Sequence, residues 1–326
     1  MRNQNSIKTR ILLFLAVLCL FGCNSAQKHE KMIKNTKKIV IAHRGASGYL
    51  PEHTLAAKSM GYAMHPDFLE QDLVLSKDDV PIVIHDIHLE TVTDVAQQFP
   101  DRKREDGRYY VIDFTYDELL QLNVSERFDA KTGKAVFKDR YPLWKSKFKL
   151  HSLQDEIELI QGLNMSTGNN IGIYPEIKAP AFHRKEGKDI SVIVLKVLSN
   201  YGYNTKKDKC ILQCFDAHEL KRIRTELKSE LFLVQLIEFE ADEKHLKEYA
   251  TYADGLGPWY KETSIDFVNW AHNLGIEVHA YTFRADDLGD YKDFDALLDY
   301  GFNTLELDGV FTDFPDRAVH FLNKSK

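Results

Sequence analysis

Histidines and carboxylates lie in or directly after short apolar runs between residues 41 and 86. The segment reads IAHRGASGYLPEHT, then FLEQDLVLS, then PIVIHD. Apolar runs of this length that are rich in Ile, Val and Leu predict buried strands, and polar residues at the ends of such strands are where α/β enzymes keep their chemistry. We therefore expect a metal-assisted catalytic site. Its candidate members are His43, Arg44, Glu70, Asp72 and His85.

Glu70 and Asp72 are two residues apart in one of these runs. In a strand, both side chains then point to the same face with their Cα atoms about 7 Å apart, which lets both carboxylates bind one hard cation. An isolated E-x-D pair is more often a charged surface face. Here the flanking residues are apolar, and two buried carboxylates without a counter-charge would be costly, so we favour a cation.

A third carboxylate, Glu176, ends the apolar run before Ile177 and Lys178. Glu176 can add another oxygen ligand, and Lys178, on the same strand face, is a point charge suited to an anionic substrate. Three carboxylates without a cysteine or histidine cluster of the zinc type indicate Ca²⁺ or Mg²⁺.

His43 and His85 both end runs rich in Ile and Val. One histidine at a strand end is usually structural, but two of them, with Arg44 beside one, suit phosphoryl chemistry. A neutral imidazole can take a proton from the attacking oxygen and a protonated one can give a proton to the leaving oxygen, because the unperturbed pKa of histidine is near neutrality. Arg44 can hold two phosphate oxygens at once.

Three aromatic residues fall at the ends of later apolar runs and could form walls of a substrate cleft. They are Phe215, Trp259 and Tyr281. Ordinary packing in the core explains them about as well. For four further histidines, His53, His88, His183 and His279, we expect structural roles.

Strand-like runs alternate with helix-length amphipathic segments, which predicts an α/β fold with a parallel sheet and crossover helices. The expected strands are 39–42, 68–75, 81–85, 171–177, 210–215, 231–237, 254–257, 277–283 and 305–312, and the clearest helices are 189–201, 217–227 and 264–274. Nine strands are one more than a (β/α)8 barrel needs. Either one of the pair 68–75 and 81–85 lies outside the regular count, because their connection is too short for a helical crossover, or 254–257 is not a strand.

Residues 87–150 interrupt this alternation and are rich in Asp, Arg, Lys and Tyr. Their one strong helix signal is Thr115 as a cap before Tyr116. We expect a small insertion on the catalytic face of the barrel, where long functional loops usually lie. Cys210 and Cys214 would be about 13 Å apart in a strand, so we expect two free core cysteines.

The amino terminus has the layout of a secretory signal. Arg2, Lys8 and Arg10 precede the uncharged apolar run 11–21, which is too short to span a bilayer. Residues 20–23 resemble a bacterial lipoprotein box, so we expect a signal peptide at 1–22, a lipidated Cys23 with a basic tether to residue 38, and a domain over 39–326. Cleavage without lipid is the alternative. The implied location is the bacterial cell envelope, with a lipid anchor on the periplasmic side or the cell surface.

Loss of residues 1–22 removes three positive charges and no negative charge, which changes the formal net charge from −6 to −9. An acidic protein of this kind has no obvious means of binding nucleic acid or anionic lipid through its overall field. We therefore expect no nucleic-acid partner and contact with a membrane through the N-terminal lipid only. A homo-oligomer is left open.

Together these segments resemble the bacterial glycerophosphodiester phosphodiesterases of the periplasmic or lipoprotein type. The matching stretches are HRGASGYLPEHT at 43–54, EQDLVLSKDD at 70–79, HD at 85–86, TDVAQQFPDR at 93–102, STGNNIGIYPEIKAP at 166–180, LQCFDAHELKRI at 212–223 and GVFTDFPD at 309–316. The resemblance implies a TIM barrel with a small inserted region and one Ca²⁺, with Mg²⁺ the weaker alternative. The implied metal ligands are Glu70, Asp72 and Glu176, the acid/base pair is His43 and His85, and Arg44 and Lys178 face the phosphate.

By the same resemblance, the expected activity is hydrolysis of glycerophosphodiesters such as glycerophosphocholine and glycerophosphoethanolamine to glycerol 3-phosphate and an alcohol. Two alternatives remain at this point. One is a surface lipoprotein that acts mainly as a binding protein, and the other is a phospholipase on the same fold, which would need an exposed apolar rim at the cleft.

Overall fold

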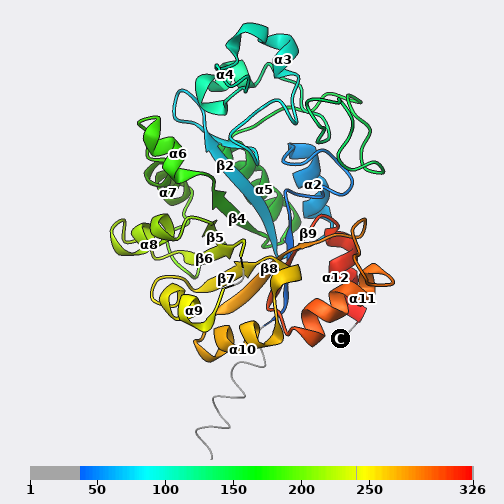
Figure 1. The fold of residues 1–326 in the computed structure, drawn as a ribbon, viewed down its shortest axis with the longest axis vertical. Coiled ribbons are helices and arrows are strands. Elements are labelled where there is room, and N and C mark those ends of the chain that lie inside the picture. The colour runs from blue at the N-terminus through cyan, green and yellow to red at the C-terminus, as the bar shows by residue number, and fades with distance from the viewer. Residues whose placement is uncertain (1–36, 240, 325–326) are drawn as a thin grey trace, which may run out of the picture. The chain divides into compact units, whose positions relative to one another are not determined.

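Eight parallel strands close into a barrel in the computed structural model of the chain (Figure 1). Their order around the barrel is β1, β9, β8, β7, β6, β5, β4, β2, and pairing of β1 with β2 closes the ring. The strands are β1 (Ile39–Ala42), β2 (Phe68–Leu75), β4 (Gly172–Ile177), β5 (Ile211–Cys214), β6 (Phe232–Ile237), β7 (Gly255–Pro258), β8 (Glu277–Phe283) and β9 (Gly309–Thr312). The predicted TIM barrel is confirmed.

The structure describes residues 37–239 and 241–324. The predicted signal peptide at 1–22, the lipidation site Cys23 and all but the last residues of the tether lie outside these ranges. Among the helices within them, none combines the length and the apolar character that crossing a membrane would require.

The ninth strand, β3 (Pro81–Val83), lies outside the barrel and pairs antiparallel with β2. Of the two explanations for the surplus strand, the first is therefore right, and residues 255–258 do form a barrel strand. The five-residue connection between β2 and β3 allows only an antiparallel return, because a parallel crossover needs a dozen or more residues.

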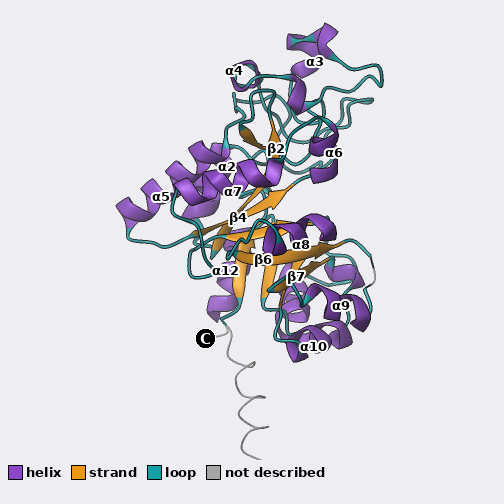
Figure 2. Cartoon of the chain, turned by 90° about the vertical axis from the view of Figure 1, so that its left-hand side faces the viewer, coloured by secondary structure: helices purple, strands orange, loops and turns teal. Residues whose placement is uncertain are grey.

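Helices surround the strands on the outside of the barrel (Figure 2). They are α2 (Leu55–Ala63), α5 (Leu153–Thr167), α6 (Pro180–Lys185), α7 (Ile190–Asn200), α8 (Ala217–Thr225), α9 (Glu243–Tyr249), α10 (Ile265–Asn273), α11 (Phe294–Asp299) and α12 (Pro315–Lys324). Side-chain caps mark several starts: Asp189 accepts from the amide of Val192 at α7, and Ser152 forms a reciprocal capping box with Asp155 at α5.

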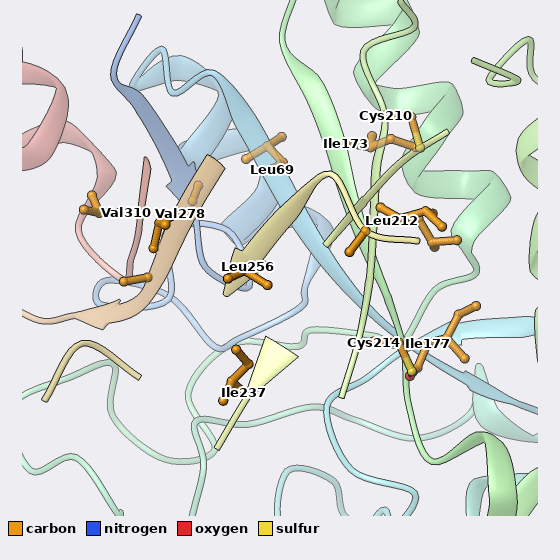
Figure 3. Packing of buried hydrophobic residues seen from close by; sticks show 14 of the residues in the cluster. Leu69, Ile173, Ile177, Cys210, Leu212, Cys214, Ile237, Leu256, Val278 and Val310 are labelled. Atoms are coloured by element: carbon orange, nitrogen blue, oxygen red, sulfur yellow. The ribbon is translucent and has the colours of Figure 1, made fainter. Parts of the chain in front are cut away.

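Alternate residues of the strands build two separate packing layers. Leu69, Ile173 and Leu212 point outward and pack in the main hydrophobic cluster (Figure 3), in which Cys210 and Cys214 are buried free thiols as expected. The other face of the same strands points into the barrel. There Phe68, Tyr174 and Phe311 pack edge to face, with ring centroids 5.9 Å and 5.0 Å apart, and fill the barrel interior.

The last barrel strand differs most from its predicted range. The expected strand 305–312 begins only at Gly309, because the chain first makes a π-helical turn at Tyr300–Thr304 and Glu306 has a left-handed backbone with φ 60°. The amide of Leu307 donates to the carbonyl of Gly301 and not to a neighbouring strand. The apolar character of this segment therefore reflects burial in a turn.

Residues 87–150 contain little regular structure, namely α3 (Val95–Gln98), α4 (Tyr116–Leu119) and two short 3-10 turns at Pro100–Arg102 and Val111–Asp113. Thr115 caps α4 in a capping box with Glu118. The segment has its own apolar cluster, which includes Val74 of β2 and Ile82 of β3. It lies next to β2 and α2 in Figure 1.

Candidate active site

A pocket of about 260 Å³ opens where the carboxyl ends of the barrel strands meet, the usual place for a site in this fold. All ten side chains that the sequence singled out as catalytic, substrate-binding or metal-binding line it. They are His43, Arg44, Glu70, Asp72, His85, Glu176, Lys178, Phe215, Trp259 and Tyr281.

Glu70, Asp72 and Glu176 form a buried acidic triad. Asp72 on β2 and Glu176 on β4 are direct neighbours in the parallel register, and one carboxylate oxygen from each of the three residues lies within 4.8 Å of the others. Gln71, between Glu70 and Asp72, points the opposite way and donates to Glu156 on α5 at 2.7 Å. The strand period of two therefore places both acidic residues inside the barrel.

Burial changes the pKa values of the three carboxyl groups of the triad. It raises the pKa of Glu70 well above the ordinary value, with the charge of Asp72 adding to the effect, and it raises the pKa of Glu176 to about 8 against the opposing charge of Lys178. Burial acts in the same direction on Asp72, but Lys178, His85 and His53 outweigh it and hold the pKa of Asp72 well below its usual range.

The triad suits a divalent cation. Oδ1 of Asp72 is buried and has no hydrogen-bond partner among the described residues, and three carboxylates at this distance repel one another unless a cation or protons neutralise them. An all-oxygen donor set fits Ca²⁺ or Mg²⁺ better than a metal that prefers nitrogen or sulphur. Glu70, Asp72 and Glu176 are thus a metal-binding acidic triad.

His43 follows β1 and is paired with an aspartate that sequence reasoning did not assign. Its Nδ1 donates to Oδ1 of Asp313 at 2.5 Å. Burial, together with the charge of Arg44, lowers the pKa of His43 to about 4. Burial opposes ionisation of Asp313, but His43, Arg284 and Arg140 hold its pKa well below the usual range. With the proton on Nδ1, Nε2 is the basic nitrogen of His43, and its lone pair accepts a long hydrogen bond from Nε of Arg44.

His85 has a matching arrangement. Its Nδ1 donates to Oδ1 of Asp86 at 2.7 Å, and burial, Arg44 and Lys178 lower its pKa to about 4. The segment that follows β3 positions His85, because the amide of the preceding residue, Ile84, donates to the carbonyl of Asp72 at 2.9 Å. The His85 side chain is 30% exposed, against 9% for His43, so His85 has the better access to solvent.

Arg44 lies between the histidine and the acidic residues. Its backbone has a left-handed φ of 58°, which lets its amide donate to Oε2 of Glu70 at 2.8 Å. Its Nε donates to Nε2 of His43 at 3.3 Å and its Nη1 to Oε2 of Glu52 at 3.0 Å. The guanidinium is thus oriented by two neighbours at the edge of the pocket.

Another part of the pocket lining is cationic and aromatic. Nζ of Lys178 lies 2.8 Å from Oε1 of Glu176 and 3.7 Å from Oδ1 of Asp72. It also lies 5.6 Å from the ring centre of Phe215, whose ring packs edge to face against Tyr281. Trp259 is 37% exposed at the pocket. These aromatic residues therefore face the pocket and not only the core.

One histidine departs from its expected structural role. His53 is buried, and its Nε2 donates to Oδ2 of Asp72 at 2.7 Å, so it orients a triad carboxylate. By contrast, His183 accepts from the amide of Leu75, and His279 contacts the hydroxyl of Tyr174 inside the barrel. A histidine ten residues after His43, outside any strand, carried no signal of this contact.

Further polar side chains around the site were also missed by sequence reasoning. They are Glu52, Asp86, Arg127, Arg140, Gln213, Arg284 and Asp313. Asp313 directly follows β9 and Asp86 directly follows His85, so the rule that selected His43 could have selected both. Arg127 and Arg140 come from the insertion, where no periodic pattern pointed to the site.

Comparison with known proteins identifies the family. The family model for the glycerophosphoryl diester phosphodiesterase family matches residues 43–317. A glycerophosphodiester phosphodiesterase from Haemophilus influenzae is 47% identical, with 98% of this chain and 100% of the relative covered. One from Treponema pallidum is 38% identical, with 89% and 93% covered.

Solved structures agree on the fold. The Oleispira antarctica phosphodiesterase solved in complex with the product sn-glycerol-3-phosphate has a TM-score of 0.63 at 21% identity, with 87% of this chain and 96% of that chain covered. The glycerophosphodiester phosphodiesterase from Agrobacterium tumefaciens has a TM-score of 0.61 at 18% identity, with 87% and 99% covered. The chain therefore belongs to the glycerophosphoryl diester phosphodiesterase family, and it is an enzyme of that family.

Proposed function

We propose that this enzyme hydrolyses glycerophosphodiesters, such as glycerophosphocholine and glycerophosphoethanolamine, to sn-glycerol 3-phosphate and an alcohol in a Ca²⁺-dependent reaction. The observation that carries the proposal is the convergence of three carboxylates, two histidines, Arg44 and Lys178 on one pocket. The complex of the Oleispira relative with sn-glycerol-3-phosphate supports the choice of product.

The cation would be held by Glu70, Asp72 and Glu176, whose oxygens lie within 4.8 Å of one another. When bound, it supplies positive charge against the phosphodiester oxygens and the charge that develops on them. We favour Ca²⁺ because Mg²⁺ is usually held by one or two carboxylates, whereas Ca²⁺ takes more oxygen ligands in a looser geometry. His53 orients Asp72 through the hydrogen bond from its Nε2 to Oδ2 of Asp72.

Proton transfer falls to the two histidines. Nε2 of His43 is the candidate base, because Asp313 fixes the proton on Nδ1. His85, with its larger exposure and its contact with Asp86, is the candidate donor to the departing alcohol, and the negative charge that the phosphodiester brings favours its protonated form. The attacking oxygen is either the neighbouring glycerol hydroxyl, which would give a cyclic phosphate, or a water molecule.

Arg44 and Lys178 complete the proposed phosphate site as two positive charges, each near a different oxygen of Asp72. Both act by stabilising negative charge on the phosphodiester oxygens. Phe215, Trp259 and Tyr281 form the wall against which the rest of the substrate would pack.

We propose further that the enzyme is a lipoprotein of the bacterial cell envelope. The support is the charged and then apolar stretch of residues 1–22, followed by Cys23 in a lipoprotein-like box. In this proposal the lipid on Cys23 is the protein's contact with the membrane, and the segment up to residue 38 is a tether.

The experiment that tests the proposed substrate class is release of glycerol 3-phosphate from a panel of glycerophosphodiesters and intact phospholipids, with and without Ca²⁺. Intact phospholipids belong in the panel because the exposed aromatic residue Trp259 lines the pocket. We expect turnover of the glycerophosphodiesters only with Ca²⁺. Turnover of phospholipids without turnover of glycerophosphodiesters would instead identify a phospholipase.

A further inference from the structure

We propose that Arg127 and Arg140, both from the insertion 87–150, are positioning residues that hold the two histidine–aspartate pairs of the active site. The insertion is then a component of the catalytic centre and not an appendage of the barrel. This inference rests on the proposed roles of His43 and His85 in proton transfer, and it adds residues that act through Asp313 and Asp86.

Arg140 holds the aspartate that pairs with His43. Its Nη2 donates to Oδ2 of Asp313 at 2.6 Å, while Oδ1 of the same carboxylate accepts from His43 at 2.5 Å. The Arg140 side chain is only 4% exposed. It is held in turn by the carbonyl of Ser47 and the carboxylate of Asp286. Oδ2 of Asp313 also accepts from Nε of Arg284 at 2.7 Å. Both oxygens of Asp313 therefore have donors, which fixes the rotation of the carboxylate, and Arg140 is the donor that the insertion supplies.

Arg127 holds the aspartate that pairs with His85 in the same way. Its Nη1 donates to Oδ2 of Asp86 at 2.7 Å, while Oδ1 accepts from His85 at 2.7 Å. The Nε and Nη2 atoms of Arg127 donate to the buried carboxylate of Glu52 at 3.0 Å and 2.6 Å. Glu52 also accepts from Arg44. Arg127 therefore links His85 to the arginine beside His43.

The two arrangements repeat one chemical device on two sides of the pocket. An imidazole donates Nδ1–H to one oxygen of an aspartate, and an insertion arginine donates to the other oxygen. A carboxylate clamped in this way holds the imidazole in one tautomer and one orientation, so that Nε2 is the atom that exchanges the proton. Loss of the clamp should lower turnover without removing any group that touches the substrate.

Other arginines of the insertion do not have this arrangement. Arg102 pairs with Glu118 at 2.9 Å, and Arg104 pairs with Asp113 and Glu186. None of these carboxylates accepts a hydrogen bond from a histidine of the pocket. General stabilisation of the insertion by ion pairs therefore does not explain why Arg127 and Arg140 each hold the partner of a catalytic histidine. Arg102 provides a matched control from the same segment.

The test compares Arg127→Gln, Arg140→Gln and the control Arg102→Gln in the full-length enzyme, with Ca²⁺ and glycerophosphocholine. We expect kcat to fall about tenfold or more for the first two variants, the range found for residues that orient a functional histidine, with KM and the Ca²⁺ requirement nearly unchanged. Arg102→Gln should keep the wild-type kcat. Arg127→Lys and Arg140→Lys, which keep one charged donor, should recover part of the loss and serve if a Gln variant does not fold.

Double variants separate positioning from general structure. Arg140→Gln should have little further effect in an Asp313→Asn background but its full effect in an Asp86→Asn background, because residues that act through one another are not additive. Arg127→Gln should show the reverse. Wild-type kcat in the Gln variants, or full additivity within each arginine–aspartate pair, would overturn the inference. Wild-type turnover of His43→Ala and His85→Ala would instead overturn the proposed function itself.

Discussion

Nδ1 of His43 lies 2.5 Å from Oδ1 of Asp313, although 270 positions separate the two residues in the chain. His43 follows the first strand and Asp313 follows the last, and parallel pairing of β1 with β9 brings the ends of these strands together. The hydrogen-bonded pair of His43 and Asp313, which is the proposed base, therefore forms only when β1 and β9 pair.

Replacing either His43 or His85 by Ala should lower kcat by about 100- to 10,000-fold, the usual contribution of general acid–base catalysis, while the fold is retained. The measurement is steady-state release of glycerol 3-phosphate, together with the thermal unfolding midpoint. His218, which is exposed on α8, provides the control variant His218→Ala with unchanged kcat. Near-normal turnover in both active-site variants would remove these histidines from the mechanism.

A buried ion pair between α2 and α5 should contribute strongly to the free energy of unfolding. Lys58 on α2 and Glu156 on α5 are fully buried, with Nζ and Oε1 2.9 Å apart, and Lys58 also donates to the carbonyl of Glu70. Lys58→Met removes the ammonium partner of the buried Glu156 carboxylate and leaves it the hydrogen bonds from His151 and Gln71, so we expect a loss of about 3 kcal/mol in the free energy of unfolding. Chemical denaturation measures this loss.

The exposed pair Lys221 and Glu248, 3.6 Å apart, supplies the control for that measurement. Lys221→Met should change the free energy of unfolding by no more than about 0.5 kcal/mol, because surface ion pairs are worth little. Equal denaturation midpoints for Lys58→Met and the wild type would show that the buried pair does not stabilise the fold.

The buried carboxyl group of Glu126 should make the free energy of unfolding depend on pH. The residue is buried in the insertion, and its Oε2 has no hydrogen-bond partner within the described part of the chain. Burial, with the nearby charge of Glu52, raises its pKa to about 7 from 4.5 and outweighs the opposing charge of Arg140. The folded protein therefore holds a proton on Glu126 that the unfolded chain releases between these two pH values.

It follows that the contribution of Glu126 to stability is complete below pH 4.5 and is lost as the pH rises toward 7. Glu126→Gln does not ionise, so relative to the wild type it should gain about 2–3 kcal/mol between pH 5 and pH 8.5. Urea denaturation at both values measures the gain. Glu105→Gln, an exposed position in the same insertion, is the control, and a gain of the same size in both variants would contradict the argument.

Substitution of Cys23 tests the proposed lipid anchor. Because the lipid of a bacterial lipoprotein is attached to the cysteine that follows its signal peptide, Cys23→Ser should leave an unprocessed or unlipidated precursor in a bacterial host. Metabolic labelling with a fatty acid and the electrophoretic mobility of the protein report this outcome. Labelling of the variant at the wild-type level would exclude Cys23 as the lipidated residue.

Much of the barrel could be predicted from the sequence, because strand burial is encoded locally. The run 68–75 coincides with β2, and its period of two correctly placed Glu70 and Asp72 on one face. The approach of His85 could not be predicted in this way. It depends on antiparallel pairing of β3 with β2 outside the barrel. This is a tertiary contact that composition does not specify.

The supporting groups were harder still to predict. Asp313 becomes a partner of His43 only when the barrel closes, and Arg127 and Arg140 lie in irregular segments without a periodic pattern. The contact of His53 with Asp72 could not be predicted either, because neither its spacing nor its surroundings in the chain indicate it. Long-range charge pairs of this kind emerge from the fold and not from local sequence.

The central claim is that Glu70, Asp72 and Glu176 bind the Ca²⁺ on which phosphodiester hydrolysis depends. It is tested most directly by release of sn-glycerol 3-phosphate from glycerophosphocholine, measured with chelator-treated enzyme as Ca²⁺ is titrated back. The account predicts that chelation abolishes turnover and that Ca²⁺ restores it along a saturable curve. Full turnover by the chelated enzyme, independent of added Ca²⁺, would contradict it.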